Sequence, residues 1–167
     1  MRTAFRALAT GVILFPLCLV SHELFHLGVL KALGGSGALI LRPWRFEFLP
    51  ATLPSLHVSG GPGLDPPRRL LFELGGPLPA ALLLLVVARP FREPAFRAAL
   101  YANVVILCFF AIIETADYVL DWRLGRDFPL LTWEEFNYGI PLLALLAFAG
   151  VAGSFRPAPR RASIRGS

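Results

Sequence analysis

The chain has 167 residues, of which 56% are hydrophobic and 16% are charged. This composition excludes an ordinary soluble domain and indicates a small protein with several membrane spans. The formal net charge of +5 comes from arginine, because Lys31 is the only lysine. Most arginines lie at the ends of apolar runs. We therefore expect them to anchor the chain among membrane lipids, and we expect no nucleic-acid partner.

The first predicted membrane span covers about residues 4–33 and follows Arg2 and Arg6. A signal peptide is the competing interpretation, since it also combines a basic start with an apolar stretch. No A-x-A-like cleavage site follows, however, and the apolar run continues for long enough to cross a bilayer. We therefore expect a retained transmembrane helix, with a kink at Pro16.

This span contains an H-E-x-x-H sequence formed by His22, Glu23 and His26. On a helix, positions i and i+4 share one face, so both imidazoles can bind one metal ion. Glu23 follows the first histidine and can act as a base on metal-activated water, as zinc hydrolases require. The alternative is that the three groups only hydrogen-bond inside a helix bundle, which is a costly way to build a core.

A strand-like segment is predicted after the first span, over Leu39 to Leu49, where Trp44 and Phe46 alternate with charged residues. Prolines at positions 43, 50 and 54 restrict it to an edge strand or an interfacial hairpin. Such a segment could hold an extended substrate by edge pairing, which makes these two aromatic residues candidates for substrate handling. For His57 an ordinary loop histidine is favoured over a metal or substrate role.

Three further membrane spans follow, and together with the first they form a single membrane-embedded domain. The predicted fold class is an all-α polytopic membrane protein with about four transmembrane helices and a short strand-like interfacial segment after the first. The domain covers 1–153, its later spans cover about 68–88, 95–120 and 137–153, and a basic tail over 154–167 is expected to be disordered.

Acidic residues in the later spans are candidates for the remaining part of a metal site. Glu114, Asp117 and Asp121 are spaced three and four apart, so they share one helix face. Counting from the starts of the two spans, Glu114 and Asp117 reach nearly the depth of the two histidines, because the first and third spans run parallel. Asp117 is the first choice for third ligand and Asp121 the second, with Glu114 as a hydrogen-bond partner of a histidine N–H.

The second span contributes a further group of residues near the same level. Glu73 and the Gly75-Gly76-Pro77 turn lie in its first turns, and the span returns from the opposite side of the membrane. We regard Glu73 and this turn as candidates for supporting the site or handling substrate. Polar groups that converge at one depth are what a buried hydrophilic site requires.

With these residues, the chain resembles the site-2 protease family of intramembrane zinc metalloproteases. The resemblance rests on His22-Glu23-Leu24-Phe25-His26 in a first membrane helix and on Gly75-Gly76-Pro77-Leu78 opening a later one. It implies that His22 and His26 bind zinc with a carboxylate from a later helix, and that Glu23 is the general base. It also implies cleavage of a membrane-embedded segment of a protein substrate.

The sequence departs from the family pattern at two places. Pro79-Ala80 stands where the family has an asparagine after its Gly-Pro, and Asn103 lacks the proline that usually follows near the third ligand. One alternative is therefore a non-catalytic membrane subunit that keeps a protease-like fold and scaffolds a larger complex. Another is a proton or ion pathway built from the acidic residues of the spans.

The expected location is the cytoplasmic membrane of a bacterium or archaeon, with both chain ends inside. That orientation places nine of the 16 basic residues on the inner side, including the short basic turn between the second and third spans and the basic tail. Cys18 and Cys108 each lie within an apolar span and lack C-x-x-C spacing, so we expect small core residues there.

Overall fold

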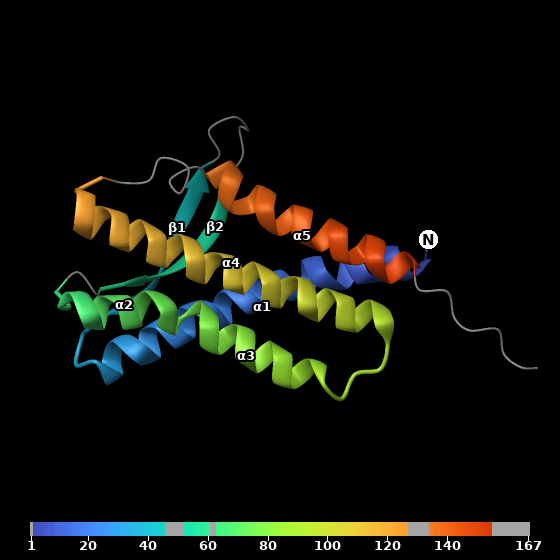
Figure 1. Ribbon diagram of the computed structural model, residues 1–167, viewed down its shortest axis with the longest axis horizontal. Helices are drawn as coiled ribbons and strands as arrows, with labels where there is room; N and C mark the ends of the chain where they lie inside the picture. The colour runs from blue at the N-terminus through green and yellow to red at the C-terminus, as the bar shows by residue number, and fades with distance from the viewer. Residues whose placement is uncertain (1, 46–51, 61–62, 127–133, 155–167) are drawn as a thin grey trace, which may run out of the picture.

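A computed structural model describes residues 2–45, 52–60, 63–126 and 134–154. This part of the chain forms an elongated helix bundle with one antiparallel hairpin against its side (Figure 1). The predicted fold class, helical with four spans and a strand segment after the first, is confirmed. The elements are α1 (Arg2–Ala32), β1 (Ala38–Arg45), β2 (Thr52–Ser59), α2 (Pro66–Gly75), α3 (Pro77–Ala88), α4 (Pro94–Leu124) and α5 (Glu134–Ser154).

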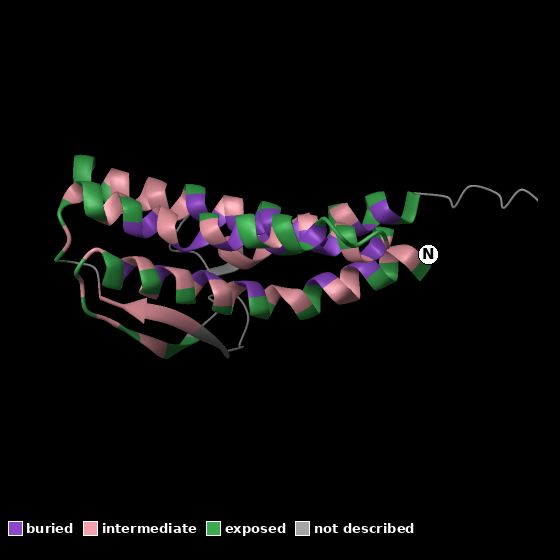
Figure 2. Cartoon of the chain, turned by 90° about the horizontal axis from the view of Figure 1, so that it is seen from below, coloured by how far each residue is buried: buried purple, intermediate pink, exposed green. Residues whose placement is uncertain are grey.

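Within the part of the chain that the structure describes, four helical segments are long and apolar enough to cross a membrane, and the protein is an integral membrane protein. Exposed residues follow the outer faces of the helices (Figure 2). Many of them are large and apolar, where a soluble protein would place polar groups. Phe5, Ile13 and Ile112 are examples, each about 70% exposed. The spans are Arg2–Ala32, Pro66–Ala88, Pro94–Leu124 and Phe136–Ser154.

Helix α1 turns one narrow face toward the rest of the bundle. Its buried residues recur at helical spacing and include both histidines of the motif: Ala7, Gly11, Cys18, His22, His26 and Leu30. The helix continues through Pro16 and ends before Gly34, whose φ of 81° is a left-handed conformation that glycine adopts readily. The sequence of α1 therefore aims the two imidazoles into the protein.

The hairpin after α1 confirms the strand-like segment expected there and explains its prolines. Pro43 of β1 lies opposite Pro54 of β2, so this pair exchanges no ladder hydrogen bonds. Because hydrogen-bonded and non-bonded pairs alternate, the backbone groups of Leu56 and Val58 also point away from β1. The outer edge of β2 therefore presents backbone N–H and C=O groups that do not pair with β1. Phe46, which the sequence singled out, lies outside the described residues.

The predicted second span is broken into two helices. The Asp65 carboxylate caps α2 by accepting a hydrogen bond from Arg68 N at 3.0 Å, and Pro66 begins the helix. At Gly76 the chain changes helix, and Pro77, which has no N–H to donate, begins α3. The break therefore follows from the Gly-Pro pair in the sequence.

Helix α4 is the centre of the bundle and packs against α1, α3 and α5. In its most apolar stretch 56% of the residues are buried, against 17% in α1. Helices α1 and α4 run in the same direction, as the depth argument requires, and α1 begins at the end of the bundle where α5 finishes (Figure 1). The tail predicted at 154–167 lies outside the described residues beyond Ser154.

Asn103 ties α4 to α1 within this apolar interior. Its side chain is fully buried, and its amide nitrogen donates to Gly11 O at 3.3 Å and to Ala99 O at 2.9 Å. The bond to Gly11 joins α1 to α4 about three turns before the first histidine. Asn103 therefore helps to set the position of the histidine-bearing half of α1 against α4.

Replacing Asn103 with alanine should lower the free energy of unfolding in detergent by about 1–2 kcal/mol, because a buried interhelical hydrogen bond is lost. Val105→Ala is the matched control, since Val105 lies on the same helix and is 46% exposed. Unfolding followed by circular dichroism compares the two variants. Equal stability of the two variants would contradict the role of Asn103 in joining α1 to α4.

Candidate metal centre

Three side chains from α1 and α4 converge on one point in the bundle. The Nε2 atoms of His22 and His26 lie 2.7 Å apart. Glu114 reaches both of them, with one carboxylate oxygen 3.3 Å from His22 Nε2 and the other 3.1 Å from His26 Nε2. Both histidines are buried, at 3% and 5% exposure. Among the described residues, these three side chains form the group whose possible metal-ligand atoms all lie close to one another.

The donor set fits a zinc ion in chemistry and in spacing. Two imidazole nitrogens and one carboxylate are the protein ligands of many catalytic zinc sites, which keep a fourth position open. Bonds of about 2.0–2.1 Å in tetrahedral geometry place ligand atoms about 3.3 Å apart. The two distances to Glu114 are close to that value, and the two nitrogens need to separate only slightly.

Both imidazoles pack against aromatic rings. The ring of Phe72 lies 4.7 Å from that of His26, and the ring of Phe110 lies 6.0 Å from that of His22, measured between centroids. Both Nδ1 atoms are buried and make no hydrogen bond within the described part of the chain. Metal-binding histidines usually donate this N–H to a carboxylate or carbonyl. Here ring packing holds the imidazoles instead.

Gly76 allows the α2–α3 break to approach the histidines closely. A Cβ at this position would lie less than 3.0 Å from ring atoms of both His22 and His26. At Gly75 a Cβ would press on the side chain of Val29, only 2.7 Å away. The Gly75-Gly76-Pro77 turn, which the sequence singled out, therefore lies directly against the candidate site.

Glu23, the candidate base, is linked to the hairpin. One oxygen of its carboxylate accepts a hydrogen bond from the backbone N–H of Val58 at 2.9 Å. That N–H is free to do so because it points outward from the strand pair. The hairpin thereby fixes the direction of Glu23 beside the cluster, which the strand pattern alone did not reveal.

A cavity of about 460 Å³ opens beside the cluster and brings five of the polar candidates to one surface. They are His22, Glu23, His57, Glu114 and Asp117. Most of its remaining wall is apolar and comes from α1, α4 and both strands: Pro16, Leu19, Val20, Leu41, Leu56, Phe110 and Ile113. The cavity therefore offers access to the cluster from an apolar side.

A second cavity of about 430 Å³ adjoins the cluster from the side of α2 and is strongly polar. Glu114 and Asp117 line this cavity too, and Asp121 lies farther along the same face of α4. Glu73 is buried there and is paired with Arg69. The structure thus gathers all the acidic candidates around the two cavities, but it brings Glu114, and not Asp117 or Asp121, to the histidines.

The other candidates from the sequence have different surroundings. His57 belongs to β2 instead of a loop, and it lines the first cavity. Burial, followed by the nearby Arg42 guanidinium, lowers the pKa of His57, so the ring is neutral at neutral pH. The backbone of Trp44 belongs to β1, while its side chain and the whole of Phe46 lie outside the described residues.

Several contacts of the site were not predicted from the sequence. The histidines contact the rings of Phe72 and Phe110, and Glu23 is hydrogen-bonded to Val58. The guanidinium carbon of Arg69 also lies over the ring of Phe72, 5.2 Å from its centroid. Apolar residues in apolar spans give no signal that separates a neighbour of the site from a core residue. The hydrogen bond from Val58 comes from its backbone N–H, so the type of residue at this position gives no sign of it.

Comparison with known proteins adds no assignment to this geometry. No family model, curated protein or solved structure matches the chain. The functional argument therefore depends on the residues of the site and on their arrangement.

Replacing Gly76 with alanine should weaken metal binding by at least about 10-fold, because the new methyl group would force both imidazoles out of position. Gly28→Ala is the control, since a Cβ there meets nothing within 4 Å although it lies on α1 close to His26. Titration with Co²⁺, followed by its visible absorption, measures the affinity. Unchanged binding in Gly76→Ala would show that the turn does not shape the site.

Proposed function

We propose that the protein is an intramembrane zinc-dependent endopeptidase that hydrolyses a peptide bond in a membrane-embedded segment of a protein substrate. The observation that carries this proposal is the meeting of His22, His26 and Glu114 inside the bundle, with Glu23 on the same cavity. Ionisable groups at this depth are costly and are usually functional. The proposal agrees with the resemblance to the site-2 protease family.

In this proposal His22, His26 and Glu114 hold the metal ion. Glu114 takes the position of third ligand because its two oxygens face the two histidine nitrogens. Asp117, which the sequence favoured for that position, lines both cavities and lies one helical turn farther along α4. A bound zinc ion would supply the Lewis acid that polarises the peptide carbonyl and activates water.

Glu23 is proposed to move the proton in the reaction. It takes a proton from the attacking water and passes it to the nitrogen of the leaving amine, as a general base and then a general acid. Its hydrogen bond to Val58 occupies one carboxylate oxygen and orients the group beside the cavity. Catalysis depends on such orientation because small displacements of a reacting group cost much of the rate.

The substrate segment must unwind to expose its amide, and an extended segment needs partners for its own backbone. The outer edge of β2 supports this step, since its backbone groups that do not pair with β1 lie beside the first cavity. Membrane lipids and the substrate protein are the proposed partners. The pairing of substrate with the segment around Trp44 and Phe46 remains a prediction from the sequence.

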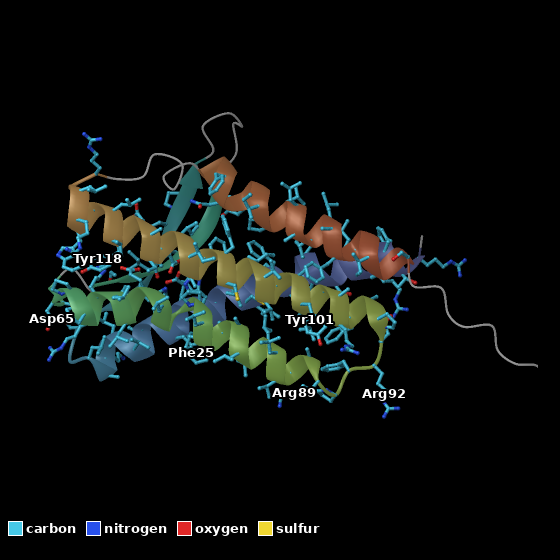
Figure 3. All side chains as sticks on the ribbon, in the orientation of Figure 1. Phe25, Asp65, Arg89, Arg92, Tyr101 and Tyr118 are labelled. Carbon is cyan, nitrogen blue, oxygen red and sulfur yellow. The ribbon has the colours of Figure 1, made fainter. Side chains whose placement is uncertain are left out.

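Both chain ends are proposed to lie on the inner side of a bacterial or archaeal cytoplasmic membrane. The α3–α4 turn supports this orientation, because it lies at the same end of the bundle as the N-terminus (Figure 1) and carries Arg89 and Arg92 (Figure 3). Arg6 of α1 also pairs with Glu93 at this end, at 3.4 Å. A concentration of arginine next to membrane spans is typical of the inner face.

Replacing Glu23 with glutamine should abolish cleavage, with a loss of about 10²–10⁴-fold in rate, while zinc remains bound. The assay uses protein in detergent micelles and a labelled apolar single-span peptide, and mass spectrometry locates the cut. Zinc content, measured on the same samples, separates loss of the base from loss of the metal. Full activity in Glu23→Gln would reject Glu23 as the base. If the wild-type protein cleaves no peptide, the scaffolding subunit is favoured instead.

Replacing Val58 with proline should lower kcat about 10-fold without loss of zinc, because the donor that orients Glu23 is removed. The substitution should leave the hairpin intact, since Val58 occupies a position that makes no ladder hydrogen bond, like Pro54. His57→Pro is the contrasting variant, because it removes a ladder donor. Equal activity of Val58→Pro and wild type would contradict the positioning role of the strand.

A further inference from the structure

The two cavities that meet at Glu114 and Asp117 differ sharply in chemistry. The second is lined mainly by charged and polar groups, whereas the first is lined mainly by aliphatic and aromatic side chains. A cavity that holds water or conducts protons needs polar groups in its wall as hydrogen-bond partners. Apolar side chains provide no such partners. The first cavity is therefore built for an apolar guest, and its volume falls in the range of ligand-binding pockets.

The polar end of the first cavity is the candidate metal centre itself. An apolar group that entered between Val20 of α1 and Ile113 of α4 would lie next to Glu23 and Glu114. An apolar group bound there would bring the part of the molecule that carries it close to the histidines. This placement is what a side-chain pocket beside a reacting peptide bond requires.

The wall formed by the hairpin favours a peptide over a lipid chain. Leu56 of β2 lies opposite Leu41 of β1, and both line the cavity. The backbone N–H and C=O of Leu56 point away from β1, at the outer edge of the strand. An extended peptide can pair with these groups while one of its side chains enters the cavity, and an acyl chain cannot.

The charges around the cavity restrict the guest further. Glu23, Glu114 and Asp117 line it, whereas no lysine or arginine does so among the residues that the structure describes. An acidic side chain held in the apolar part of the cavity, away from the metal-binding groups and from His57 and Asn137, would therefore find no basic partner among the described residues. A small side chain would leave most of the space unfilled and would lose the burial of apolar surface.

We propose that this cavity binds a large aliphatic or aromatic side chain of the substrate next to the bond that is cleaved. The pocket thereby selects extended membrane segments that carry such a residue and rejects those with glycine or aspartate there. Val20 is a specificity-determining residue, because it lines the cavity while its side chain is 42% exposed. This inference rests on the proposed function, since it assigns the substrate of the same site.

The test begins with a series of single-span peptides that differ at the residue on either side of the scissile bond. Leucine and phenylalanine there should give kcat/KM at least about 10-fold above glycine, and aspartate should prevent cleavage. Val20→Trp should partly fill the cavity and remove the preference for large residues, while peptides with glycine are still cut. Wild-type cleavage without any side-chain preference would overturn the pocket and leave the protease intact.

Val12→Trp is the matched control, because Val12 lies on the same helix, is 49% exposed and does not line the cavity. It should keep the wild-type preference and zinc content. If no peptide is cut, binding of the same labelled peptides to Glu23→Gln still tests the pocket. Tighter binding of the leucine peptide than of the aspartate peptide, weakened at least about 10-fold by Val20→Trp, would support it. Equal binding of both, as expected if lipid fills the cavity, would overturn it.

Discussion

The contact of one α4 carboxylate with two α1 imidazoles is the constraint on which the rest of the structure depends. A charged group and two imidazoles inside an apolar bundle are tolerated only if they satisfy one another or share a cation. Asn103 joins the two helices by a hydrogen bond to Gly11 O, and Gly76 leaves room for the imidazole rings. The helix break at Gly76 serves this packing.

The hairpin connects this buried cluster to the outside of the bundle. Pro43 and Pro54 form a pair that makes no ladder hydrogen bonds. Because bonded and non-bonded pairs alternate, every second residue of β2 turns its backbone groups outward, where they are available to other partners. Val58 uses one of them to orient Glu23, and Leu56 presents another beside the apolar cavity. A short strand pair thus supports both the proposed base and the proposed substrate site, although little of the chain is strand.

Much of the fold could be predicted from the sequence, because long apolar runs and Gly-Pro breaks determine membrane helices locally. The level of the site could also be predicted, since His22, His26 and Glu114 lie at matching depths in parallel helices. Depth alone could not choose between Glu114 and Asp117, because it does not fix the rotation of α4 about its axis. That rotation depends on side-chain packing across the interface, as does the contact of Glu23 with a backbone N–H.

Zinc content is the measurement that tests the central claim most directly. Protein purified in detergent after metal-replete expression is compared as wild type, Glu114→Gln and Asp117→Asn, with protein folding checked by circular dichroism. The account predicts about one zinc per chain in wild type and in Asp117→Asn, and a loss of the metal in Glu114→Gln. Zinc retained in Glu114→Gln but lost in Asp117→Asn, or no zinc in wild type, would contradict it.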